Sequence, residues 1–251
     1  MATRSETVDI LVDDEHIAGT FLTPPTKLPG VLFVHGWGGS QARDLARARG
    51  IAGLGCICLS FDLRGHAQTL AQQQTVTREQ NLQDLLAAYD LLVQHPNIDP
   101  SAIAVVGTSY GGYLAAILTS LRPVRWLAMR VPALYRDEDW AMPKRQLDRE
   151  VLNRLRRSRV SPESNRALSA CAAFKGDVLI VESEQDSFVP HETIMSYRAA
   201  FQQTHSLTHR IIVGADHALS DEGCQRAYTD ILVGWATEMV VGGRLNSRDE
   251  K

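Results

Sequence analysis

Short apolar segments of strand length alternate with longer segments of helical character through most of this chain. The apolar segments are residues 30–36, 56–62, 103–109, 126–131, 177–183 and 209–214. Helical segments are expected at about 40–52, 77–94, 113–120, 191–202 and 221–239. Unbroken apolar runs are typical of parallel strands buried on both faces, and right-handed crossovers place helices on both sides of such a sheet. The pattern predicts an α/β fold, a single domain over residues 1–251 with a doubly wound, mostly parallel sheet.

Two segments depart from this alternation. Residues 6–12 and 16–22 are typical of an antiparallel β-hairpin turning at Asp13-Asp14, which we expect at the N-terminal edge of the sheet. Residues 133–170 are polar and arginine-rich and are longer than a simple crossover requires. Leu147, Val151 and Leu155 have helical spacing there, so we predict a small helical cap insertion over the carboxyl ends of the strands. The alternative is a surface crossover without substrate contact.

The overall composition is that of an ordinary soluble globular domain. Apolar residues make up 44% of the chain, charged residues 22%, and the net charge is −3. The charge provides no basic field for binding nucleic acid. The first residues lack an apolar run of signal-peptide length, and no run approaches the ~18 residues that span a membrane. With no C-x-x-C pair among four cysteines, we expect a cytoplasmic protein that binds neither nucleic acid nor membranes.

The segment VVGTSYGG (105–112) contains a G-x-S-x-G motif centred on Ser109. Chance alone would supply such a match in about one chain of this size in ten. The position of this match is more informative, because Ser109 ends an apolar run and begins a helical segment. A sharp strand-to-helix turn, the nucleophile elbow, exposes a serine hydroxyl above the sheet, and flanking glycines avoid a backbone clash. The context predicts that Ser109 is a nucleophile.

A nucleophilic serine needs a base and an acid that orients the base. In α/β-hydrolases the chain order is serine, acid, histidine, and Asp186 and His217 each follow a predicted strand in that order. The other candidates are poorly placed: His35 and His66 precede the serine, His191 begins a helix, His205 and His209 lie at the far end of a strand, Asp216 adjoins His217, and Glu182 and Glu184 lie within or at the end of a strand. We predict a catalytic triad of Ser109, Asp186 and His217.

An oxyanion hole needs backbone N–H donors close to the nucleophile. The residue after the serine, Tyr110, is expected to supply one donor, and Trp37 of HGWGG (35–39) the other. The alternative interpretation of HGWGG is a nucleotide-binding loop. It is disfavoured because Gln41 breaks the G-x-G-x-x-G pattern and no Walker lysine follows.

Together, HGWGG, DLRGH (62–66), GTSYGG, the acid before Phe-Val-Pro, and DHALS resemble the serine α/β-hydrolase superfamily over residues 28–240. The motifs are most similar to small carboxylesterases and to feruloyl-esterase-like or dienelactone-hydrolase-like enzymes. GTSYGGYLAA and the spacing through DSFVPHE also resemble the catalytic domain of prolyl-oligopeptidase-type peptidases. Ala67 replaces the last glycine of the family turn D-x-R-G-H-G. We interpret Asp62, Arg64 and His66 in this turn as structural.

The resemblance and the motifs predict a serine esterase that uses a two-step acyl-enzyme mechanism without a metal or organic cofactor. The expected partner is a small-molecule ester with a medium-sized or aromatic acyl group, and the protein is expected to be a monomer or homodimer. The residues predicted to bind substrate are Trp37, Tyr110, Tyr135, Trp140 and Met142. Two alternatives are a peptidase or amidase, disfavoured because the sequence lacks an oligopeptidase propeller, and a catalytically inactive binding protein with this fold.

Overall fold

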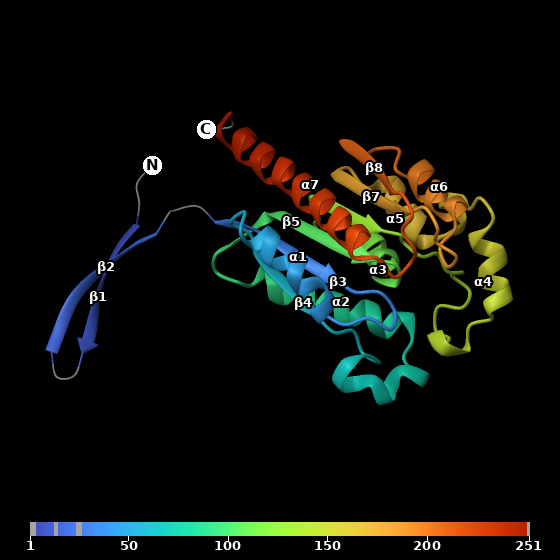
Figure 1. Ribbon diagram of the computed structural model, residues 1–251, viewed down its shortest axis with the longest axis horizontal. Helices are drawn as coiled ribbons and strands as arrows, with labels where there is room; N and C mark the ends of the chain where they lie inside the picture. The colour runs from blue at the N-terminus through green and yellow to red at the C-terminus, as the bar shows by residue number, and fades with distance from the viewer. Residues whose placement is uncertain (1–3, 13–14, 24–26, 250–251) are drawn as a thin grey trace.

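A six-stranded parallel sheet forms the centre of the protein (Figure 1). The computed structural model describes residues 4–12, 15–23 and 27–249. The strand order is β4-β3-β5-β6-β7-β8. These strands are β3 (Leu28–Val34), β4 (Ile57–Phe61), β5 (Ile98–Thr108), β6 (Trp126–Arg130), β7 (Asp177–Ser183) and β8 (Ser206–Ile212). Each overlaps a predicted apolar run, although β5 and β8 begin earlier than predicted, and the arrangement confirms the doubly wound α/β fold.

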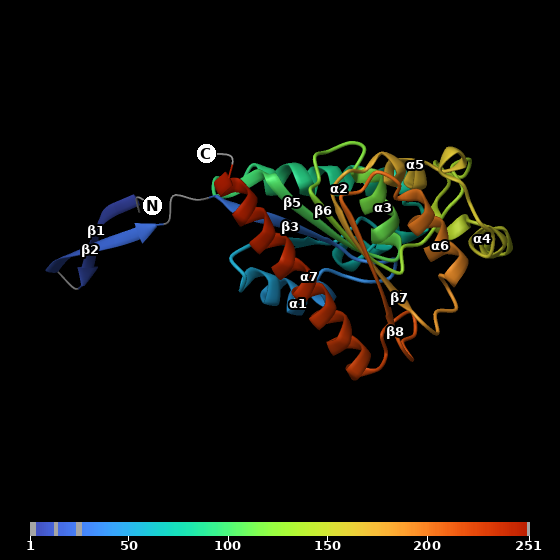
Figure 2. The same cartoon turned by 90° about the horizontal axis from the view of Figure 1, so that it is seen from above.

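Helices cover both faces of this sheet, as the view from above shows (Figure 2). On one face lie α1 (Ala42–Ala52) and α7 (Glu222–Asp249), and on the other lie α2 (Arg78–Val93), α3 (Tyr110–Leu118), α5 (Arg166–Ala173) and α6 (His191–Ala200). Helix α2 begins at a capping box in which Thr77 and Gln80 bond each other's backbone N–H groups. No helix within the described residues is long and apolar enough to cross a membrane.

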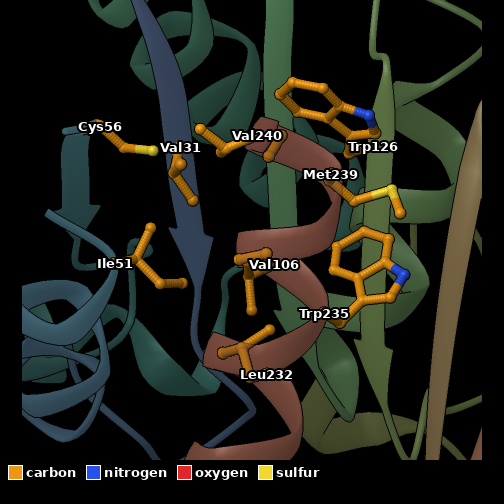
Figure 3. Close-up of a pocket in the computed structure, with 11 residues that line it drawn as sticks. Val31, Ile51, Cys56, Val106, Trp126, Leu232, Trp235, Met239 and Val240 are labelled. Carbon is orange, nitrogen blue, oxygen red and sulfur yellow. The ribbon is translucent and has the colours of Figure 1, made fainter. Parts of the chain in front are cut away.

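The sheet separates two hydrophobic cores. The core beneath α7 is shown in Figure 3, where Leu232, Trp235 and Val240 pack toward Val106 and Trp126 of the sheet. The packing leaves an apolar cavity of only about 10 Å³. Buried side chains of β3 and β5 therefore contact helices on both faces, and this is why their sequences are continuously apolar rather than alternating.

The N-terminal hairpin forms a two-stranded antiparallel sheet of its own. Strand β1 (Arg4–Val12) pairs with β2 (Glu15–Thr23), and the register runs from Arg4 opposite Thr23 to Val12 opposite Glu15. The predicted turn at Asp13-Asp14 lies outside the described residues. The predicted position at the sheet edge differs from the structure, in which β4 and β8 are the edge strands. Among the described residues, β1 pairs only with β2, so the hairpin is a sheet separate from the six-stranded one.

Segment 133–170 contains 3₁₀-helices η2 (Lys144–Gln146) and η3 (Pro162–Ser164) and helix α4 (Arg149–Arg156), and it runs into α5. Asp148 and Asn165 cap α4 and α5 with their side-chain oxygens. Leu168 and Cys171 of α5 are fully buried in the same core as α3. Helix α5 is thus part of the main helical layer. The residues of the predicted insertion that lie outside this layer end before α5 begins at Arg166, not at residue 170. That the remaining residues form a cap over the site stays a prediction.

Candidate active site

Ser109 lies at the sharp turn between β5 and α3, as the motif predicts. Its backbone has φ 52° and ψ −111°, a conformation that costs a non-glycine residue about 1–3 kcal/mol. Three hydrogen bonds hold it there: the Ser109 N–H donates to the Arg130 carbonyl (2.9 Å), and the Ser109 carbonyl accepts from the N–H groups of Tyr113 (3.1 Å) and Ala133 (3.0 Å). A Cβ on Gly107 would lie 2.6 Å from the Gly111 carbonyl oxygen, so the motif glycine is required sterically.

Asp186 and His217 are brought together by the ends of β7 and β8. Asp186 Oδ2 lies 2.6 Å from His217 Nδ1, and the aspartate side chain is only 1% exposed. Its other oxygen, Oδ1, accepts from the backbone N–H groups of Phe188 and Val189, both at 2.8 Å. Because both carboxylate oxygens have hydrogen-bond partners, the loop fixes the orientation of Asp186 and, through it, that of the His217 ring.

An open cleft of about 580 Å³ joins the predicted catalytic groups. Ser109 and His217 both line it, as do Gly36 and Trp37 of the HGWGG loop. Its other lining residues are His35, Gly39, Arg43, Asp44, Arg47, Thr108, Arg130, Ala218, Leu219, Ser220 and Gln225. Asp186 lies behind His217 and contacts its Nδ1, so Nε2 is the ring nitrogen available to Ser109.

Hydrogen bonds made by His35 and Asp62 fix the HGWGG loop and the residues that follow it. His35 Nε2 accepts a hydrogen bond from the Leu63 N–H (3.1 Å), so the proton is on Nδ1, which donates to the Gly36 carbonyl (2.8 Å). Burial lowers the pKa of His35 and favours this neutral form. Asp62 accepts from the backbone and side-chain N–H groups of Gln41 at 2.8 and 2.7 Å. The loop is therefore preorganised, while the oxyanion role of the Trp37 and Tyr110 amides stays a prediction.

Most of the predicted substrate-binding side chains do not line this cleft. Trp37 does, whereas the Tyr110 ring is completely buried and donates its hydroxyl to Asn81 Oδ1 at 2.9 Å. Tyr135 is buried against Tyr110, with ring centroids 5.7 Å apart. Trp140 packs beside the core, and Met142 is 40% exposed outside the cleft lining. Apart from Trp37, the predicted acyl pocket is thus not the cleft.

A lysine fills the space between these aromatic rings instead. Lys144 Nζ lies 4.2 Å from the Trp37 ring centroid, 5.3 Å from that of Tyr110 and 5.5 Å from that of Tyr135. We call this cluster the aromatic box. Burial lowers the pKa of Lys144, while Tyr135 opposes that effect. Among the described residues that line the cleft, none comes from segment 133–170, so this segment reaches the HGWGG loop through the aromatic box.

The turn after β4 has the contacts expected of a structural element. The Arg64 guanidinium pairs with Asp84 (2.5 Å between Nε and Oδ1). The buried His66 ring lies edge-on to those of His35 and Trp37, with centroids 4.8 Å apart in each case. Burial lowers its pKa. Ala67, at the family glycine position, has φ 46° and thus keeps the left-handed turn without a glycine.

The charged residues of the cleft were missed by sequence reasoning. Arg43, Asp44 and Arg47 come from the first turns of α1, and Arg130 ends β6. Burial raises the pKa of Asp44 to about 6, although Arg47 lies 3.5 Å from it. The available signal was the charge of Arg130 at the carboxyl end of an otherwise apolar run, where α/β proteins place their ligands.

Several proteins are similar to this chain. An uncharacterized protein of Mycobacterium tuberculosis is 27% identical over 219 residues, which cover 86% of this chain and 72% of that protein. A dienelactone hydrolase from Anabaena variabilis has a TM-score of 0.59 at 19% identity, covering 93% of this chain and 96% of that one. A monoacylglycerol lipase from Paleococcus ferrophilus has a TM-score of 0.61 at 14% identity, covering 95% and 100%.

A peptidase has the same fold over part of its length. The acylaminoacyl peptidase of Pyrococcus horikoshii has a TM-score of 0.64 at 15% identity, covering 96% of this chain and 42% of the peptidase. Residues 45–242 match the prolyl oligopeptidase family, and this match spans most of the sequence. Together with the fold and the elbow at Ser109, the match shows that the chain belongs to the prolyl oligopeptidase family, within the serine α/β-hydrolase superfamily.

Proposed function

We propose that this protein hydrolyses carboxylic esters through an acyl-enzyme formed on Ser109. One observation carries the proposal: the strained Ser109 elbow and the hydrogen-bonded Asp186–His217 pair meet at one open cleft. Strain at a half-buried serine that lines the cleft, with a base oriented by a buried acid, is the arrangement that nucleophilic catalysis needs.

In the first step, His217 Nε2 accepts the Ser109 hydroxyl proton while Oγ attacks the ester carbonyl carbon. Asp186 holds the ring through Nδ1 and stabilises the imidazolium that forms. The tetrahedral oxyanion accepts hydrogen bonds from the Trp37 and Tyr110 amides. Collapse of this intermediate breaks the ester C–O bond, and the imidazolium protonates the departing alcohol. A water activated by His217 then hydrolyses the acyl-enzyme and releases the acid.

Two of the similar structures, a dienelactone hydrolase and a monoacylglycerol lipase, support an ester as the substrate. Peptide hydrolysis is the second candidate, and the family match supports it. A cleft of about 580 Å³ fits a medium-sized acyl group. The ring of Trp37 in its lining can pack against an aromatic acyl group.

Labelling with a fluorophosphonate probe tests the nucleophile. We expect the native protein to be labelled and Ser109→Ala to remain unlabelled. Ser120→Ala, at the opposite end of α3, is the matched control and should be labelled like the native protein. A native protein that does not react with the probe would contradict the proposal.

Turnover of matched substrates separates the two candidate activities. We expect p-nitrophenyl esters of medium chain length to have a higher kcat/KM than aminoacyl p-nitroanilides, and both activities to require Ser109. A higher kcat/KM for the anilides would instead assign the protein as a peptidase.

A further inference from the structure

Arg130 is a buried cation that faces the cleft beside the catalytic groups. The residue is 5% exposed, ends β6 and belongs to the lining of the cleft. Its Nη2 donates to the carbonyl oxygen of His217 (3.0 Å), and its Nη1 donates to Ser183 Oγ (3.3 Å). Both acceptors are neutral. Within the part of the chain that the structure describes, no carboxylate forms an ion pair with Arg130.

The two carboxylates whose charges act on Arg130, those of Asp186 and Asp44, already have other partners. Asp186 is bonded to His217, and Asp44 lies 3.5 Å from Arg47 Nη1. Arg130 also has an aromatic partner, with its Cζ 5.5 Å from the Tyr228 ring centroid. Burying a guanidinium without a paired anion is costly. A guanidinium carries five N–H donors, and the described residues accept only two hydrogen bonds from Arg130. The remaining donors are therefore available to a ligand in the cleft.

The rest of the lining strengthens the positive charge. Arg43 and Arg47 stand one helical turn apart on α1, so the cleft contains three arginines and one aspartate. Arg43 is exposed at the rim, whereas Arg47 is half-buried and lies over the Tyr228 ring at 4.7 Å from its centroid. A cleft of this size with an excess of buried and rim cations attracts and retains anions.

We propose that the cleft binds esters that carry a carboxylate, with Arg130 as the anchor of that carboxylate and Arg43 and Arg47 contributing at its rim. This inference rests on the proposed ester hydrolysis and specifies its substrate class. The planar guanidinium matches a carboxylate with two parallel N–H donors. Because Arg130 contacts the His217 backbone and its own carbonyl accepts from the Ser109 N–H, the anchored group lies beside the reacting ester.

Binding to Ser109→Ala tests the inference without turnover. Two ligand pairs differ only in methylation of the carboxylate: monomethyl and dimethyl adipate, with the charge on the acyl side, and 4-acetoxybutanoate and its methyl ester, with the charge on the alcohol side. Calorimetric titration should give at least one of the acids a Kd about tenfold or more below that of its methyl ester, the effect of a charge-assisted hydrogen bond. Which pair responds identifies the side of the ester that carries the charge.

Substitutions then assign the effect to Arg130. Introduced into Ser109→Ala, Arg130→Gln should abolish the preference for the acid. Since Arg130→Gln also removes the bond to the His217 loop, Arg43→Gln is the milder variant, and we expect it to reduce the preference about two- to threefold. Arg49→Gln, on an exposed position of α1 outside the cleft lining, should leave the preference unchanged.

The outcomes separate this inference from the proposed function. If both acids bind no more tightly than their methyl esters, the carboxylate site is disproved, even where native protein hydrolyses neutral esters. If an acid is preferred and the preference depends on Arg130 and Arg43, the site is supported. Fluorophosphonate labelling of the native protein then decides independently whether that site serves hydrolysis.

Discussion

Cationic side chains lie on both sides of the Ser109 elbow, but they line an open cleft on one side and pack among aromatic rings on the other. On one side, the cleft is open and polar, and Arg130 and Arg43 have no carboxylate partner among the described residues. On the other side, the aromatic box is filled by Lys144, and the rings of Tyr110 and Tyr135 are buried. Trp37 belongs to both, because it lines the cleft and contacts Lys144.

The two sides differ in how their cations are packed. In the cleft, Arg47 and Arg130 share the ring of Tyr228, at 4.7 and 5.5 Å from its centroid. Around the aromatic box, Arg78 lies 5.3 Å from the Tyr135 centroid and Arg166 lies 4.0 Å from that of Trp140. Such contacts contribute about 0.5–2 kcal/mol each to packing and leave no room for substrate. We therefore expect changes to the catalytic groups of the cleft to alter kcat/KM, and changes around the aromatic box to alter stability.

Asp186→Asn on the cleft side should have the largest effect. An asparagine preserves the shape but favours the wrong tautomer of His217, so kcat for a p-nitrophenyl ester should fall by about 10³–10⁴-fold. Asp216→Asn is the matched control, since Asp216 adjoins the histidine but accepts from Ser220. Its kcat should remain within about threefold of native. Equal losses in both variants would mean that the acid is wrongly assigned.

Asn81→Ala should have the largest effect on the side of the aromatic box. Asn81 is buried, accepts from the Tyr110 hydroxyl, and donates to the Arg64 carbonyl and to Asp84. Its loss leaves the buried Tyr110 hydroxyl unpaired and removes two further hydrogen bonds, although Asp84 keeps its pairing with Arg64. The free energy of unfolding in urea should therefore fall by about 3–4 kcal/mol.

Asn153→Ala, on an exposed position of α4, is the control for this change. It should alter the free energy of unfolding by less than about 0.5 kcal/mol. Folded Asn81→Ala should keep its kcat/KM within about threefold, because Asn81 does not line the cleft. A large loss of kcat/KM in protein that remains folded would break the division between the two sides.

Sequence reasoning succeeded where a signal is local. Ser109, Asp186 and His217 each follow a strand of the parallel sheet, and parallel strands bring their carboxyl ends to one edge, so a shared location could be predicted. Tyr110 could not be placed in this way. All residues of α3 are buried, and an all-apolar helix gives no indication of which side chains face a cleft. Arg130 was overlooked because its charge stands at the end of a run that predicts a buried strand.

Asp44→Asn tests the electrostatics of the cleft through pH. Burial raises the pKa of Asp44 in the folded protein to about 6, from 3.8, despite the opposing charges of Arg47, Arg130 and Arg43. Between these pH values the folded state binds more protons than the unfolded state, so stability falls as pH rises from about 4 to 6 and stays lower above it. The loss from this group is at most about 3 kcal/mol.

In Asp44→Asn that contribution is absent. The difference in free energy of unfolding between the variant and native protein should therefore change through this pH interval, in favour of the variant as pH rises. Urea unfolding at several pH values between 4 and 8 measures it. A difference that is independent of pH would show that Asp44 titrates normally and that the cleft is less desolvated than its geometry indicates.

Ala67→Gly should change the free energy of unfolding least. The change should be a gain, whereas an alanine-to-glycine substitution in an ordinary helix lowers the stability. Ala67 is exposed and has φ 46°, so glycine relieves a left-handed strain of about 1–2 kcal/mol and loses part of this gain to unfolded-chain entropy. The free energy of unfolding should rise by about 0.5 kcal/mol. Ala71→Gly, exposed in the same 3₁₀-helix η1 (Ala67–Gln74), should instead lower it by about 0.5–1 kcal/mol. The turn before Ala67 also holds the His66 ring against that of Trp37 in the aromatic box. Equal destabilisation by Ala67→Gly and Ala71→Gly would show that this turn is unstrained.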